Sequence, residues 1–354
     1  MTKTIRIKDI AQLAGVSVGT VDRVLHNRGQ VSKDSHSKVM EILEKTGYKP
    51  NLIARTLGSN KTYRVVVIIP DPAQDEYWKF SNDGIQQALD EWGQYGVKIE
   101  SHYFDLYDKN SFKKVAEEAL DPRPDGIVTA PIFHEEAVQF FNTCAELDIP
   151  YVAFNNSVPQ SNPVTYIGQN LCQSGRVAAE LLHMNHRSGT FAILHLYDDI
   201  HNSTHLSEKE KGFKTYFEEQ GNEFSVVSLD LNNSHESTLE NELKDLLADP
   251  QLKGVFVTTS KGASVVSAIL EKQGKNEIRL VSYDLLKENR QFLKKGIIDF
   301  IINQNSKQQA SLSITHMANH LLFKKKLQPT YLFPLEIITR QSLESYLNAD
   351  IRLT

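Results

Sequence analysis

Apolar residues gather in short continuous runs along most of the chain, and amphipathic stretches of helical length separate these runs. Short runs rich in β-branched residues are typical of parallel strands that are covered on both faces. The predicted strands are 65–69, 97–104, 126–129, 151–154, 191–196, 225–229, 254–258, 279–282 and 299–303. The predicted helices between them include 80–95, 111–120, 135–147, 174–183 and 263–273. This alternation predicts an α/β fold with doubly wound parallel sheets, and roughly ten strands favour two lobes over one sheet.

The first sixty residues have a different pattern, in which three short helical periods follow closely on one another. The first helix covers 8–14 and ends at Gly15, Ser17 is the expected N-cap of a second helix that runs to Leu25, and Ser32 caps a third. The positions expected to face inward are Ile10, Leu13, Ala14, Val21, Val24, Leu25, Val39, Ile42, Leu43 and Thr46. Two helices joined by a tight turn, with a third behind them, predict a small all-α helix-turn-helix domain.

The second helix of such a domain enters the major groove of DNA. Its expected outward positions are Val18, Gly19, Asp22 and Arg23. Arg23 can donate two hydrogen bonds to guanine, and Asp22 can accept from cytosine or orient the arginine. The residues better suited to phosphate contacts are Ser17, Thr20 and Asn27. A three-helix bundle without a DNA role is the structural alternative.

Charge is distributed unevenly in a way that agrees with this interpretation. Residues 1–60 contain ten Lys and Arg against five Asp and Glu, a formal charge of +5. The whole chain carries −5, so the remaining residues carry −10. A basic head on an acidic body favours a polyanionic partner at one end only.

The segment IRIKDIAQLAGVSVGTVDRVLHNRGQVS, followed by GYKPNLIARTLGSNKT, resembles the DNA-binding segment of the lactose/galactose-repressor family. The family core D-[IV]-A-x-x-A-G-V-S-x-x-T-V-S-R-V is matched almost residue for residue from Asp9 to Val24. One departure is Asp22, where the family usually has serine. An acidic side chain that faces DNA weakens binding by repulsion from the phosphates, unless it contacts a base or holds Arg23. We therefore expect an altered base preference.

Residues 50–58 resemble the hinge helix of the same family. The resemblance implies that two such helices pair over the minor groove and insert a leucine between base steps, which here is Leu57. Ala54 would allow close approach, and Asn51 or Arg55 would lie near the DNA backbone. A stretch this short is marginal as an isolated helix, and a flexible linker is the alternative. The expected domains are therefore 1–49 for DNA binding, 50–63 for the hinge and linker, and 64–354 for effector binding.

The body resembles the periplasmic-binding-protein domain of that family, through segments such as DGIVTAP, IPYVAFNN, RLVSYD and DFIINQNSKQQA. The resemblance implies three crossings between lobes, near residues 158, 304 and 327. Lobe 1 would then hold 64–157 and 305–326, and lobe 2 would hold 158–304 and 327–354.

Ligands of open α/β sheets bind beyond the carboxyl ends of the strands. The effector-binding candidates at or near these ends are Asp75, Tyr77, Trp78, Asn155, Asn156, Lys209, Thr259, Ser260, Asp284 and Gln304. Asp284 and Gln304 match the sugar-binding pattern, whereas Asn155-Asn156 replaces the usual Asp-Arg. The ligand-holding arginine of relatives falls on Ser207, with Lys209 and His205 nearby. Fewer charges favour a neutral ligand.

Other classes of function lack their usual signals. No run is long and apolar enough for a membrane helix, and MTKTIRIKDI is not a signal peptide. Cys144 and Cys172 match no metal or disulfide spacing, as expected in the cytoplasm. The histidines show no metal motif, and His195, His201 and His205 are expected on the surface or in loops. We expect no catalytic residue, no metal site and no cofactor.

These observations together predict a sequence-specific DNA-binding transcriptional regulator, most simply a repressor. Its partners would be double-stranded, pseudo-palindromic operator DNA and a small sugar-like effector bound between the lobes. A homodimer or a larger assembly is expected, because one helix-turn-helix reads only half a site. A solute-binding receptor without gene control is the alternative, and an enzyme is the third.

Overall fold

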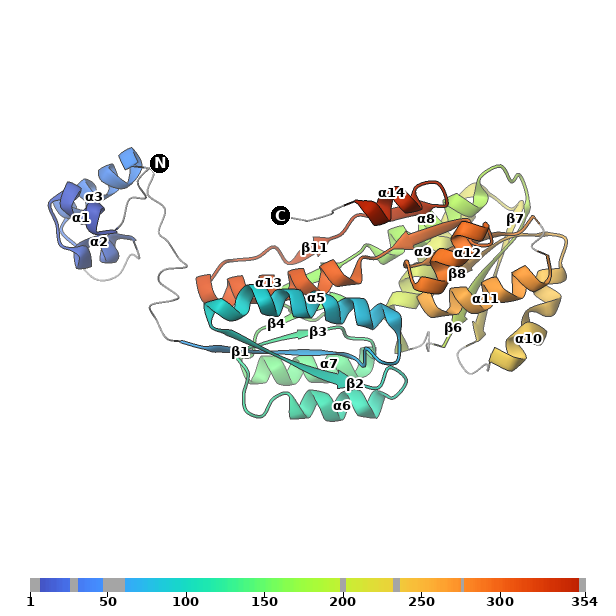
Figure 1. The fold of residues 1–354 in the computed structure, drawn as a ribbon, viewed down its shortest axis with the longest axis horizontal. Helices are drawn as coiled ribbons and strands as arrows, with labels where there is room; N and C mark the ends of the chain where they lie inside the picture. Colours follow the sequence, from blue (N-terminus) through green and yellow to red (C-terminus); the bar gives the residue numbers. More distant parts are fainter. Residues whose placement is uncertain are drawn as a thin grey trace. The chain divides into compact units, whose positions relative to one another are not determined.

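The computed structural model describes residues 7–25, 31–46, 61–197, 202–231, 236–274 and 277–349. The chain folds into two compact units, Met1–Lys61 and Thr62–Thr354 (Figure 1). In the described ranges the first unit contains only helices, and the second contains two six-stranded sheets.

The first unit is a small cluster of helices. Its described elements are α1 (Ile7–Ala14), α2 (Val18–Leu25) and α3 (Lys33–Thr46). Each helix contributes one fully buried side chain to a shared core, namely Ile10, Val21 and Val39. Only three residues separate α1 from α2. The predicted helix-turn-helix is confirmed.

Side-chain caps begin the second and third helices, as predicted. Ser17 Oγ accepts a hydrogen bond from Thr20 N at 3.1 Å, and Ser32 Oγ accepts one from Ser35 N at 3.2 Å. These bonds satisfy amide groups that have no partner inside the helix. Gly15, at the end of α1, has a φ of +64°, which glycine adopts without steric cost.

The prediction that Leu13 faces inward is wrong, because 59% of its surface is exposed. The buried stripe of α1 consists of Ile10, Ala11 and Ala14. On a helix with 3.6 residues per turn these three positions lie on one face, and Leu13 lies at its flank.

The first lobe of the larger unit is a parallel sheet with the strand order β11-β5-β4-β3-β1-β2. Its strands are β1 (Tyr63–Pro70), β2 (Val97–Phe104), β3 (Gly126–Thr129), β4 (Tyr151–Asn155), β5 (Thr165–Gly168) and β11 (Thr330–Leu332). Its helices are α5 (Glu76–Trp92), the short 3-10 helix η1 (Gly93–Tyr95), α6 (Lys109–Glu118), α7 (His134–Glu146) and α13 (Ser306–Phe323). Helices α5 and α13 cover one face, and α6 and α7 cover the other (Figure 1).

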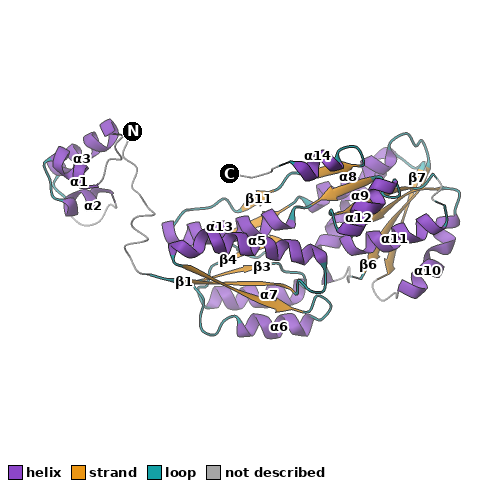
Figure 2. Cartoon of the chain, in the orientation of Figure 1, coloured by secondary structure: helices purple, strands orange, loops and turns teal. Residues whose placement is uncertain are grey.

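The second lobe repeats this plan with the strand order β12-β10-β9-β8-β6-β7, in which only β12 is antiparallel to its neighbour. Its strands are β6 (Gly189–Leu196), β7 (Phe224–Leu231), β8 (Leu252–Val257), β9 (Arg279–Tyr283), β10 (Phe300–Asn303) and β12 (Glu336–Thr339). Its helices are α8 (Leu171–His183), α9 (Thr204–Gln220), α10 (Glu236–Ala248), α11 (Ser260–Lys272), α12 (Lys287–Lys295) and α14 (Leu343–Asn348). Figure 2 shows helices on both sides of the strands, so the doubly wound α/β fold is confirmed.

The crossings between the lobes differ from two of the three predicted positions. Strands β5 and β11 belong to the first sheet, so the chain crosses after Gly168 and after Leu332, not near 158 and 327. The middle crossing, between β10 and α13, lies at the predicted position near 304. Three strands were not predicted, namely β5, β11 and β12, and they have only four, three and four residues, so none has a long apolar run.

Candidate functional site

The outer face of α2 carries the residues predicted to contact DNA. Val18, Gly19, Asp22 and Arg23 are exposed, whereas Val21 and Val24 are buried. At the start of this face, the hydroxyl oxygens of Ser17 and Thr20 lie 2.9 Å apart. The face therefore presents one guanidinium group, one carboxylate and two hydroxyls, the groups needed for base and phosphate contacts.

The other predicted DNA contacts lie outside the described residues. They are Asn27, Asn51, Ala54, Arg55 and Leu57.

A pocket with about 610 Å³ of empty space lies between the two lobes. Eight of the ten predicted effector-binding residues line it: Asp75, Tyr77, Trp78, Asn155, Lys209, Thr259, Ser260 and Gln304. Asn156 and Asp284 are buried beside it without lining it.

Two aromatic side chains at the start of α5 form the first-lobe wall of this pocket. Asp75 Oδ1 caps the helix by accepting from Tyr77 N at 2.8 Å, which fixes the first turn. The rings of Tyr77 and Trp78 are 5.0 Å apart and nearly perpendicular. Asn155 Nδ2 donates to Tyr77 Oη. Burial and the nearby charge of Asp284 raise the pKa of Tyr77, so its phenol stays protonated and available as a hydrogen-bond donor.

Asp284 lies behind the pocket and orients two of its lining residues. Its Oδ2 accepts from Ser260 Oγ at 2.5 Å and from Gln304 Nε2 at 2.7 Å, and its Oδ1 accepts from Gln304 N at 2.8 Å. Burial raises the pKa of Asp284, while these hydrogen bonds act against that shift. The carboxylate thus fixes the side chains that face the cavity.

Lys209 brings a cationic group from α9 into the pocket, although only 2% of its surface is exposed. Its Nζ donates to Thr258 O at 3.0 Å and lies 3.6 Å from the centre of the Tyr283 ring. Helix α9 packs closely on α8, since a Cβ at Gly175 would lie 1.9 Å from Lys209 O. This close approach places Lys209 at the cleft.

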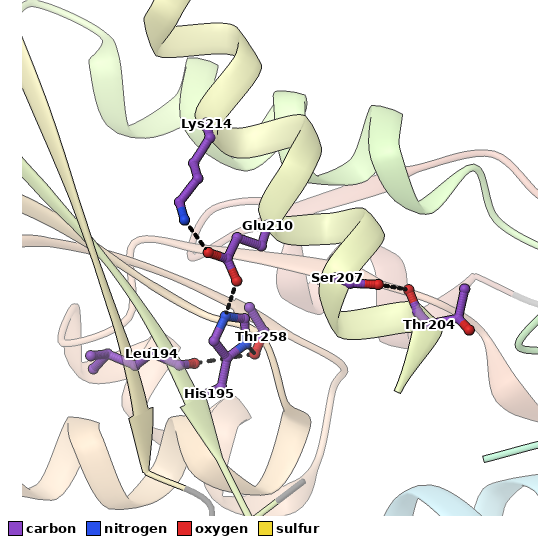
Figure 3. A network of polar contacts seen from close by, with 7 residues as sticks. All are labelled: Leu194, His195, Thr204, Ser207, Glu210, Lys214 and Thr258. Atoms are coloured by element: carbon purple, nitrogen blue, oxygen red, sulfur yellow. Dashed lines mark hydrogen bonds and ion pairs between the residues drawn. The ribbon is translucent and has the colours of Figure 1, made fainter. Parts of the chain in front are cut away.

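Ser207, which matches the arginine position of sugar-binding relatives, does not line the pocket. It is exposed, and its Oγ donates to Thr204 O at 3.0 Å (Figure 3). His205 lines the pocket instead, and its Nδ1 lies 3.3 Å from Asn156 Nδ2 and 2.8 Å from Ser203 Oγ. Asn156 thus supports His205 from behind.

Several pocket residues were not among the predicted contacts. They are Leu106, Tyr107, Ile132, Leu196, Tyr197, His205, Thr258 and Lys261. Most follow the ends of β2, β3, β6 and β8, so the same strand-end rule, applied to every strand, would have found them. The prediction that His195 is a surface or loop residue is wrong, because it lies within β6 and is 1% exposed. His201 lies outside the described residues.

Left-handed backbone conformations mark the strand ends around the pocket. Asn155, Tyr197 and Asp284 have φ values of 66°, 70° and 59°, at the carboxyl ends of β4, β6 and β9. Tyrosine adopts this region at a steric cost that asparagine and aspartate partly avoid. Such conformations cluster at functional sites, where the surrounding structure holds them.

In the part of the chain that the structure describes, no helix is long and apolar enough to cross a membrane. No group of three or more His, Cys, Asp or Glu residues there could hold a metal ion.

Comparisons with known proteins agree for both units. The periplasmic binding protein domain family matches residues 65–325, and the lacI family of bacterial regulatory proteins matches residues 6–51. The chain is 24% identical to the ribose operon repressor of Halalkalibacterium halodurans over 78% of this chain and 80% of that protein. It is 27% identical to catabolite control protein A of Streptococcus mutans, over 60% of this chain and 61% of that protein.

A solved structure of a LacI transcriptional regulator from Bacteroides fragilis is similar with a TM-score of 0.74 and 26% identity. The similarity covers 81% of this chain and all of that one. These matches agree with the helix-turn-helix unit and with the two-lobed unit of the structure. The chain belongs to the lacI family of bacterial transcriptional regulators, which are DNA-binding proteins with an effector domain of the periplasmic-binding-protein type and are not enzymes.

Proposed function

We propose that this chain is a cytoplasmic repressor whose affinity for its operator is controlled by a sugar or sugar derivative bound between the lobes. The observation that carries this proposal is the chemistry of the pocket. One wall presents the Tyr77 and Trp78 rings, and the remaining lining includes hydroxyl and amide groups such as Ser260 and Gln304. Aromatic faces suit the apolar faces of sugar rings, and fixed polar groups suit their hydroxyls. The name of the ribose operon repressor supports this class of effector.

Contacts across the cleft supply a way to couple effector binding to DNA binding. Lys287 N donates to Glu76 Oε2 at 2.8 Å at one rim, and Asn202 joins the start of α7 at another rim. An effector that touches both lobes favours the arrangement in which these contacts form. Coupling of this kind is reciprocal, so operator DNA would change effector affinity by the same factor.

The proposed assembly is a homodimer on pseudo-palindromic DNA. Two copies of α2 would contact two half-sites, because a single helix-turn-helix reads only one. Leu57, with Ala54 and Asn51 or Arg55 beside it, would act in the minor groove, as proposed from the family pattern. Asn27 would contact a phosphate.

A thermal-shift screen of the full chain tests the effector class. The panel holds D-ribose, D-arabinose, D-glucose, D-galactose, D-fructose, their phosphates, sugar alcohols and nucleosides. Ligand at about 100 times its Kd stabilises a protein by about 2.7 kcal/mol. We expect at least one sugar or sugar derivative to raise the melting temperature and Trp78→Leu to abolish the increase. Trp92→Leu, which removes a tryptophan from the same helix away from the pocket, should keep it. If no carbohydrate in the panel raises the melting temperature, the proposal is contradicted.

A further inference from the structure

His195 is a buried polar side chain that connects two elements of the second lobe. Its Nε2 lies 2.8 Å from Glu210 Oε2 on α9, and its Nδ1 lies 2.9 Å from Thr258 Oγ1 just after β8 (Figure 3). Lys214 Nζ contacts the other carboxylate oxygen of Glu210. Both ring nitrogens of His195 therefore have partners, although the ring does not line the pocket.

The hydrogen positions in this cluster follow from its donors and acceptors. The pKa of Glu210 is lowered, against the effect of burial, by its bonds with Lys214 and His195, so the carboxylate only accepts. His195 Nε2 must then carry a hydrogen. Burial lowers the pKa of His195 although Glu210 opposes this shift, so the ring is neutral at pH 7 and its Nδ1 accepts. The Thr258 hydroxyl has one hydrogen and lies within hydrogen-bond distance of two acceptors, His195 Nδ1 at 2.9 Å and Leu194 O at 3.1 Å.

The same two elements carry the second-lobe side of the effector pocket. Thr258 lines the pocket, and its carbonyl oxygen holds Lys209 Nζ at 3.0 Å. Lys209 is the residue directly before Glu210 on α9. His195 therefore links two elements: it bonds to Glu210 on α9 and to Thr258 at the end of β8. Both elements also supply residues that line the cavity.

We propose that His195 and Glu210 are positioning residues of the effector pocket, which fix Lys209 and Thr258 by bridging α9 to the end of β8. They act without touching the effector. The assignment of an effector to this pocket rests on the proposed function, whereas the bridging role can be measured without any effector. Loss of the bridge leaves α9 bonded to Thr258 only through the Lys209 hydrogen bond among the contacts described above, so the Lys209 ammonium group becomes more accessible.

Lysine acetylation of the full chain tests the bridge. Acetic anhydride is the probe, and the labelling rate of Lys209 is read by peptide mass spectrometry. In the wild-type protein Lys209 should react slowly, because it is 2% exposed and hydrogen-bonded. His195→Leu removes both hydrogen bonds and fills a similar volume, and we expect labelling of Lys209 to become roughly tenfold faster. His195→Gln keeps one donor and one acceptor, so it should restore slow labelling.

A matched control separates positioning from general loss of stability. His183 Nδ1 lies 3.0 Å from Tyr216 Oη, so His183 also binds α9, at a place away from the pocket. His183→Leu should leave the labelling of Lys209 unchanged. Urea unfolding of each variant shows whether the labelling rate of Lys209 simply follows the free energy of unfolding. Should His195→Leu fail to fold, Glu210→Ala carries the test, because 13% of the Glu210 side-chain surface is exposed, against 1% for His195.

Each outcome decides the proposal. Fast labelling in His195→Leu or Glu210→Ala, with slow labelling in His195→Gln and His183→Leu, supports the bridge. Unchanged labelling in both disrupting variants, or equal acceleration in the control, overturns it. A sugar panel without a ligand would contradict the proposed function and leave this result standing.

Discussion

Replacing Asn202 should weaken effector binding although this residue does not line the pocket. Its Oδ1 accepts from Glu135 N at 3.1 Å, and its Nδ2 donates to Glu136 Oε2 at 3.0 Å. Both bonds cross from the second lobe to the start of α7 in the first. Glu136 is 3% exposed, and Lys109 and Lys113 also face its carboxylate. Asn202→Ala therefore removes two bonds that exist only while the lobes are together.

The expected size of the effect follows from these two bonds. A neutral hydrogen bond contributes about 1 kcal/mol and a bond to a charged group somewhat more, so their loss costs about 2 kcal/mol and roughly thirtyfold in effector affinity. Burial alone would raise the pKa of Glu136, but the Asn202 bond and the two lysines lower it overall. Asn202→Ala therefore also removes the largest of the effects that lower this pKa, which leaves the buried carboxylate of Glu136 less well stabilised.

Isothermal titration with the sugar found in the screen measures this change. Asn142→Ala, on an exposed position of the same helix α7, is the matched control and should bind with wild-type affinity. Wild-type affinity in Asn202→Ala would refute the argument that these contacts stabilise the ligand-bound arrangement. A loss in both variants would point to a general effect on α7.

Three further changes have defined outcomes. Arg23→Ala should cost about 1–3 kcal/mol of binding to the specific operator and leave non-specific binding nearly unchanged, as a filter-binding titration on both DNAs would show; equal losses would exclude base contact. Deleting residues 1–60 should abolish operator binding and keep effector binding. Operator binding retained in a mobility-shift assay would contradict the assignment of DNA binding to these residues. Because burial lowers the pKa of His195 below its ordinary 6.5, the unfolded chain binds a proton there first and the free energy of unfolding should fall as the pH falls below 6.5. His195→Gln should flatten that slope in urea unfolding, and an unchanged slope would show that other groups cause it.

The helix-turn-helix and most strands of the two sheets could be predicted because their sequence signals lie within a few neighbouring residues. The N-cap at Ser17, the turn glycine Gly15 and the apolar strands each depend on neighbouring residues. The strand-end rule placed Tyr77 and Gln304 at the pocket for a similar reason, since parallel strands deliver their carboxyl ends to one edge.

What the sequence did not reveal depends on contacts between distant residues or on very short elements. His195 and Glu210 are fifteen positions apart and meet only after α9 packs on the sheet, so a polar residue in β6 gave no sign of burial. Lys209 was among the predicted effector contacts, whereas the close packing of α9 against Gly175, which accompanies its place at the cavity, joins residues distant in the sequence. Strands β5 and β11 are stabilised by their neighbours in the sheet and not by long apolar runs of their own.

Under the proposed function, occupation of the cleft controls the affinity of the protein for its operator. The direct test selects an operator in vitro with the full chain and measures its Kd by fluorescence anisotropy with and without the identified sugar, in the wild type and in Trp78→Leu. We predict a change in operator Kd of roughly tenfold or more in the wild type and none in the variant, within the usual range of coupling free energies. An operator Kd that is the same with and without bound sugar in the wild type would contradict it.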